Sequence, residues 1–147
     1  MTEEYRTQVA QMAQVLRELH RSLIVAARRQ YEEEHGELGG SYAVLQHLAD
    51  NPAFAWLRPL TALVSRLDAL PADAQIGAAE AAAVRAEASR LINPAEGEDS
   101  TFYQQLRDAR SFAPDLVVLH AHSRAALGAL PLTADPAQRA VAGNAQE

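Results

Sequence analysis

Apolar residues recur at steps of three and four along most of this chain, which is the spacing of helices that bury one face. The stretch 54–70 shows the pattern plainly and holds the only tryptophan, Trp56. Its apolar positions at this spacing are Leu57, Leu60, Leu63, Val64, Leu67 and Leu70. A longer stretch from Tyr5 repeats the pattern at Val9, Met12, Leu16, Leu19, Leu23 and Ala26. Both stretches are predicted to be helices that pack through an apolar stripe.

The first of these helices should end near Gly36, because glycine adopts the left-handed conformation that closes many helices. Three carboxylates at residues 32–34 lie at the negative end of the helix dipole, so we expect the last turn to fray. A short helix over residues 41–49 follows. Its apolar residues predicted to face inward are Val44, Leu45 and Leu48.

Two prolines divide the central stretch. Pro52 suits a first helical position, whereas Pro59 lies further in, where it cannot donate a backbone hydrogen bond. We therefore predict two linked pieces, a short one that carries Phe54 and Trp56 and a longer one over residues 59–70.

Three more helices are predicted, over residues 77–92, from Ser100 or Thr101 to Arg110, and over residues 116–130. No segment has a convincing strand pattern. The chain is therefore predicted to be all-α, an up-down four-helix-type bundle with one or two additional short helices. Residues 1–130 should form this single domain. Residues 131–147 have no periodicity and are predicted to be a disordered tail.

Charge and composition exclude several classes of function. The chain has 147 residues, a net charge of −6 and no cysteine, so cysteine chemistry is excluded. An acidic protein without clustered basic residues is not expected to bind nucleic acid. No apolar run is long enough for a membrane span, and the acidic N-terminus lacks the pattern of a secretory signal. We expect a cytoplasmic protein that binds no membrane.

Two histidines lie on apolar helix faces. By helical spacing His20 is among Leu16, Leu23, Ile24 and Ala27, and His120 lies between Leu116 and Leu127. The two rings could meet in a bundle and bind a haem, a metal or a small molecule. The alternative, which we favour, is that each is a core histidine with a backbone carbonyl or a carboxylate as partner.

The segment Trp56-Leu57-Arg58-Pro59 combines an aromatic ring, a fixed cation and a kink. Such a group can line an anion or partner pocket. The alternative is structural: Arg58 packs its stem on Trp56 and pairs with a carboxylate, for which Asp68 and Glu18 are candidates. No catalytic motif accompanies either arrangement, so no catalytic or metal-ligating residue is assigned.

The segments Leu-His-Arg-x-Leu at residues 19–23, Phe-Ala-Trp-Leu-Arg-Pro-Leu at residues 54–60 and Leu67-Asp68 resemble those of a family of uncharacterised small bacterial proteins. The resemblance covers about two thirds of the chain. It implies a small helical bundle and carries no activity or site residues with it.

The sequence thus favours a non-enzymatic helical bundle that acts through contact with a protein partner or with itself, as in a homodimer, and that needs no cofactor. The alternative is a haem-, metal- or small-molecule-binding bundle that uses His20 and His120, with Arg58 near Trp56.

Overall fold

The structure is a computed structural model that describes residues 2–98 and 100–132, and all its regular elements are helices. Their order along the chain is α1 Thr2–His35, α2 Ser41–Asp50, the 3-10 helix η1 Pro52–Leu57, α3 Arg58–Asp68, α4 Ala78–Ile92, α5 Thr101–Arg110 and α6 Pro114–Ala129. No strand occurs in these two ranges. The predicted all-α class is confirmed.

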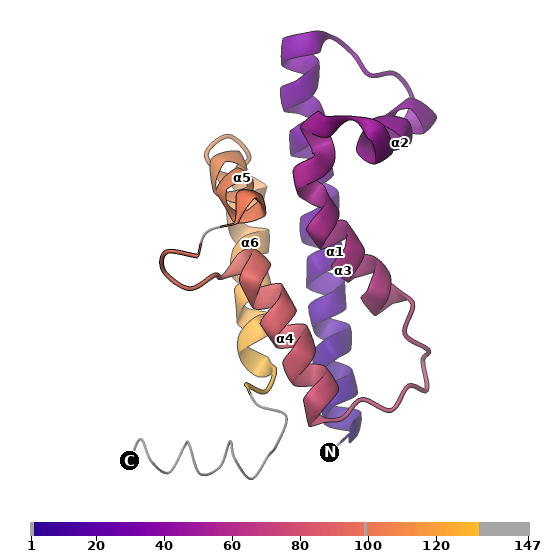
Figure 1. Ribbon diagram of the computed structural model, residues 1–147, viewed down its shortest axis with the longest axis vertical. Helices are drawn as coiled ribbons and strands as arrows, with labels where there is room; N and C mark the ends of the chain where they lie inside the picture. Colours follow the sequence, from indigo (N-terminus) through magenta and orange to yellow (C-terminus); the bar gives the residue numbers. More distant parts are fainter. Residues whose placement is uncertain (1, 99, 133–147) are drawn as a thin grey trace.

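The long helix α1 organises the fold. It packs most extensively against α6 and also against α3 and α4 (Figure 1). The chain climbs along α1 from the N-terminus, descends through α3, climbs again through α4 and descends through α6. Helix α5 lies near the upper end of α6, whereas α2 projects to one side of α1 near its C-terminal end.

The core follows the predicted stripe of α1. All six of its predicted apolar positions are buried, and Met12, Leu16, Leu19 and Leu23 are completely enclosed. From α3 the core takes Leu60, Leu63, Val64 and Leu67, and from α5 it takes Phe102, Leu106 and Ala109. Leu70, at the end of the predicted stripe, is exposed because α3 ends at Asp68.

The two prolines separate the central elements as predicted. The side chain of Asn51 accepts a hydrogen bond from the Ala53 N–H at 2.9 Å and caps η1, with Pro52 in the first turn. Pro59 occupies the first turn of α3, where its missing N–H leaves no helical bond unmade. The chain therefore passes directly from η1 into α3 through Leu57 and Arg58, which both have helical backbone angles.

The C-terminal end of α1 differs from the prediction. The last turn is helical: α1 continues to His35, and the Gly36 N–H donates to the Glu32 carbonyl at 2.8 Å. Gly36 closes the helix with the expected positive φ, of 88°. The Glu32 carboxylate faces both the Arg28 guanidinium and the Leu38 N–H, so its charge is compensated at the end of the dipole.

The prediction for Leu45 of α2 is wrong. This side chain is 64% exposed, whereas Val44 and Leu48 are half-buried, and α2 has no fully buried residue. Helix α2 carries apolar residues on two sides, and η1 covers one of them. Burial of both sides would need a second neighbour, which the described chain does not supply.

Two further predictions concern the termini and membranes. Residues 133–147 of the predicted tail lie outside the described residues. Within the described part, no helix is both long and apolar enough to cross a bilayer.

Candidate functional site

His20 lies between α1 and α3, half-buried, with its Nε2 2.8 Å from Thr61 Oγ1. The Thr61 hydroxyl donates its single hydrogen to the Leu57 carbonyl, at a distance of 3.1 Å. With that hydrogen on the Leu57 carbonyl, Nε2 of His20 is the donor in its bond to Thr61. Burial lowers the pKa of His20 below 6.5 because it disfavours the charged ring. His20 thus joins α1 to α3 through a neutral side-chain hydrogen bond.

His120 is 1% exposed and joins three helices. Its Nε2 donates to the Ile92 carbonyl at the end of α4, at 2.7 Å, and so satisfies one of the acceptors that a helix leaves open. Its Nδ1 consequently accepts from Arg110 of α5 at 3.3 Å. Tyr103 presents its ring edge-on at 6.1 Å. This arrangement matches the structural alternative, a core histidine with a backbone carbonyl partner.

Burial is the largest cause that lowers the pKa of His120, and the charges of Arg124 and Arg110 lower it further. The hydrogen bond to Ile92 opposes these effects without cancelling them. The ring therefore stays neutral at pH 7. A proton on Nδ1 would remove the acceptor for Arg110 and place two positive charges face to face.

The rings of His20 and His120 share no hydrogen-bond partner in the described structure. Their ring nitrogens bond to Thr61 in one case and to Ile92 and Arg110 in the other. Across the described ranges, no three residues among His, Cys, Asp and Glu are grouped closely enough to hold a metal ion. A ligand shared by the two rings would have to displace partners on three different helices.

Trp56 and Arg58 also point to different neighbours. The Trp56 ring packs against Phe102 of α5, with centroids 6.0 Å apart, and lines a hollow of about 570 Å³ between η1 and α5. Arg58 is not part of that hollow. It donates to the Ala49 carbonyl at the end of α2, at 2.9 Å.

The carboxylates suggested as partners of Arg58 do not pair with it. Asp68 accepts from Arg17 of α1 at 2.6 Å, and the structure gives Arg58 no bond to Glu18. Arg58 bonds instead to a carbonyl that is left open at the end of α2. A search for carboxylate side chains does not consider such backbone acceptors.

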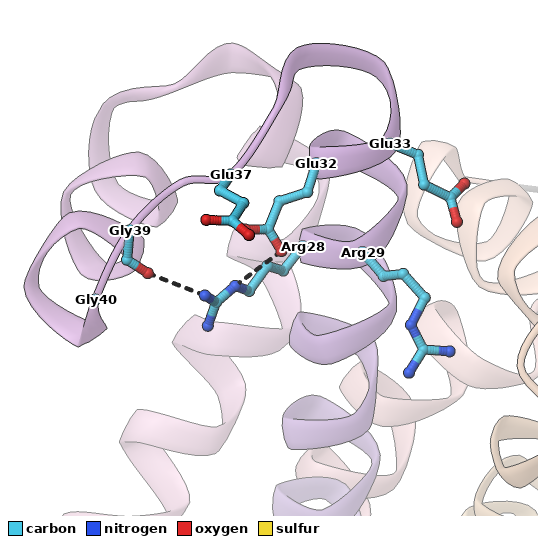
Figure 2. A pocket seen from close by; sticks show the side chains of 7 residues that line it. All are labelled: Arg28, Arg29, Glu32, Glu33, Glu37, Gly39 and Gly40. Carbon is cyan, nitrogen blue, oxygen red and sulfur yellow. Dashed lines mark hydrogen bonds and ion pairs between the residues drawn. The ribbon is translucent and has the colours of Figure 1, made fainter.

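A cluster of charged residues surrounds the α1–α2 loop and lines a hollow of about 560 Å³ (Figure 2). Arg28 donates through Nε to Glu32, at 3.1 Å, and through a terminal nitrogen to the Gly39 carbonyl, at 2.9 Å. Glu32 in turn accepts the Leu38 N–H at 2.9 Å. Arg29 and Glu33 point away from the loop. Arg28 and Glu32 therefore form a clamp, which we call the loop clamp, and their charges are used to hold the loop.

The loop clamp predicts a local effect of Glu32→Gln. The Leu38 hydrogen bond is the main cause that lowers the pKa of Glu32, so the clamp is complete above pH 4.5 and is lost as the pH falls through the lower folded pKa. We expect the Leu38 amide of the variant to exchange faster with deuterium at pH 6, as measured by NMR. Glu33→Gln is the control and should leave this amide unchanged. Equal exchange in both variants would contradict the clamp.

The outward face of α2 is a candidate contact surface that the sequence did not reveal. Tyr42 is 75% exposed and Leu45 is 64% exposed, and Ala49 lies one turn further along the same side. We call these three residues the α2 outer face. One signal in the sequence could have identified this face. The short helix has apolar residues on both of its sides, and a single neighbouring helix can cover only one side.

Comparison with protein-family models, with curated proteins and with solved structures finds no match to this chain, so no family relationship adds to what the geometry supports.

Proposed function

We propose that this protein is a non-enzymatic helical bundle that acts by self-association through the α2 outer face. The observation that carries the proposal is the exposure of Tyr42 and Leu45 on a helix that buries none of its own residues. Large apolar side chains grouped on a projecting element are typical of contact surfaces. Tyrosine is also among the residues enriched at the centres of interfaces.

For the body of the protein, we propose the up-down four-helix-type bundle. Helices α1, α3, α4 and α6 are its members, and α2, η1 and α5 are the additional short elements. The alternating direction of the four helices along the chain supports this proposal (Figure 1), as does the packing of α1 against the other three. In such a bundle α2 stands outside the common core, free to meet a partner.

The charge distribution favours a second copy of the chain as the occupant. Each copy carries a net charge of −6, so two copies repel each other over most of their surfaces. Helix α2 has only one charged residue, Asp50, and its outer face has none. A twofold contact places the same surface patch of both copies against itself, which requires a patch without like charges. The α2 outer face meets that requirement.

The contact is expected to be weak. Helix α2 has ten residues, so it is about 15 Å long. Stable interfaces bury about 1,200–2,000 Å² in total, more than one face of such a helix offers. We therefore expect a dimer that dissociates on dilution.

The charged residues support a structural reading over a catalytic one. The three ion pairs found in the described residues join Arg17 to Asp68, Arg28 to Glu32 and Arg66 to Glu87. Two of them connect different helices, and the third belongs to the loop clamp. These charged side chains therefore hold helices and the α1–α2 loop in place.

Light scattering over protein concentrations from about 10 μM to about 1 mM tests the proposal, because this range brackets weak association. We expect the mean mass of the wild type to rise toward that of a dimer. The double variant Tyr42→Ser and Leu45→Ser should remain monomeric with an unchanged circular dichroism spectrum. The matched control exchanges Val117 and Val118, exposed apolar residues of α6, for serine, and should still associate. A wild type that stays monomeric throughout would refute the proposal.

A further inference from the structure

A third hollow, unrelated to the α2 outer face, lies between α1, α3 and α4. Its volume is about 300 Å³, within the range of small-molecule sites. Its walls are aliphatic, from Val9 of α1, Leu63 and Leu67 of α3 and Val84 of α4. The chain between α3 and α4 completes it with Leu70 and Ile76. We call it the α3–α4 pocket.

Four polar residues line the α3–α4 pocket. Gln75 is exposed, and the other three, Arg66, Glu80 and Glu87, have polar partners. Arg66 pairs with Glu87 and so links α3 to α4. The Glu80 carboxylate accepts the Gly77 N–H at 2.9 Å, at the beginning of α4. A bound molecule would therefore meet mainly apolar surface. Glu87 is paired with Arg66, whereas the partner of Glu80 is the uncharged Gly77 N–H.

The charges at the mouth define the ligand further. Arg66 contributes one positive charge, and Glu80 and Glu87 contribute two negative charges, so their sum is −1. An anionic amphiphile would place its head group against this excess of carboxylate. Leu70, which is 43% exposed, extends the apolar wall to the surface, where part of a ligand can remain outside. A compact, uncharged apolar molecule suits both features.

We propose that the α3–α4 pocket binds one small, uncharged, apolar molecule and discriminates against anionic analogues with the same ring system. The inference does not depend on self-association, because none of the residues of the α2 outer face lines this pocket.

Two fluorescent dyes with the same rings test the proposal. N-phenyl-1-naphthylamine is uncharged, and 8-anilino-1-naphthalenesulfonate is the same molecule with a sulfonate added. We expect saturable binding of one uncharged dye per chain, with an affinity at least about tenfold higher than that of the sulfonate, a factor large enough to resolve by titration. Equal affinity for the two dyes, or no saturation, would overturn the proposal.

A matched pair of variants locates the binding site. Ala83 is exposed at the mouth of the pocket, so Ala83→Phe should cover the opening without disturbing the core. Ala86→Phe places the same ring at an exposed position of α4 that does not line the pocket. We expect Ala83→Phe to weaken dye binding about tenfold or more and Ala86→Phe to leave it unchanged.

Two further readouts separate the possible outcomes. Circular dichroism and thermal melting establish that both phenylalanine variants are folded. The Tyr42→Ser and Leu45→Ser double variant should bind the uncharged dye as the wild type does, even if self-association fails. Loss of dye binding in that double variant would place the dye on α2 and overturn the assignment to the pocket. Equal dye affinity in the two phenylalanine variants would also overturn that assignment.

Discussion

Leu19→Ala is expected to lower the free energy of unfolding by about 2–5 kcal/mol, the largest effect that we predict for a single substitution. Leu19 is completely buried at the centre of the stripe of α1. Alanine removes the apolar contacts of three carbon atoms and leaves a cavity that the surrounding helices can fill only in part. Urea denaturation followed by circular dichroism measures the change.

Leu45→Ala is the matched control, because it makes the same chemical change on the α2 outer face. Leu45 is 64% exposed, so the free energy of unfolding of the dilute monomer should change by no more than about 0.5 kcal/mol. A loss in Leu45→Ala as large as that in Leu19→Ala would mean that α2 turns this face inward. A loss below about 1 kcal/mol in Leu19→Ala would mean that the stripe of α1 is not packed as described.

His120→Leu is expected to cost about 1–3 kcal/mol of unfolding free energy at pH 7.5, because it leaves the Ile92 carbonyl and the Arg110 guanidinium without their partner. His122→Leu is the control on the same helix. His122 is exposed, so its replacement should change the unfolding free energy by less than about 0.5 kcal/mol. Similar losses in the two variants would contradict the buried role of His120.

The cost of His120→Leu should shrink as the pH falls. The pKa of His120 is lowered in the folded protein, so the unfolded chain binds more protons between that folded value and 6.5. The wild type therefore loses stability as the pH drops from about 7.5 through this window and loses no more from this group below it. The pKa of His20 is also lowered in the folded protein, so His20 likewise makes the wild type less stable as the pH falls. Unfolding curves at several pH values should show a shallower slope for His120→Leu than for the wild type, and parallel slopes would contradict the account.

The elements of the fold could be predicted where a local signal fixes them. Pro52 and Pro59 mark the beginnings of η1 and α3, Ser100 caps α5, and Gly36 closes α1. Each signal acts through the backbone within one turn of helix, so no knowledge of distant residues is needed. The stripe of α1 is also local, because a long helix with one apolar side has only one way to be buried.

The orientation of α2 could not be predicted in the same way. Its sequence has apolar residues on two sides, and which side meets the body depends on the loop before it. The loop clamp fixes that loop through Arg28 and Glu32 of another helix. The positions of Gly36 and Gly39 reveal a turn with positive φ angles, but they do not reveal the carbonyl that Arg28 finds.

The candidate site residues depend on partners that the sequence pattern hides. His120 lies 28 residues beyond Ile92, whose carbonyl it satisfies, and Arg58 bonds to the carbonyl of Ala49. Every residue has a backbone carbonyl, so nothing in the side-chain pattern identifies the one left open at a helix end. Helical spacing predicts that His20 and His120 lie on inner faces. It does not predict that the two side chains bond to different helices.

A single spin label on α2 tests the central proposal most directly. The chain has no cysteine, so Ala49→Cys creates a unique attachment point beside Tyr42 and Leu45. Helices in contact lie about 8–10 Å apart, so pulsed electron paramagnetic resonance should detect a short interchain distance in this variant. The same label at the exposed Ala86→Cys of α4 should give only longer interchain distances. A short distance at position 86, or none at position 49 at concentrations where light scattering shows a dimer, would contradict self-association through the α2 outer face.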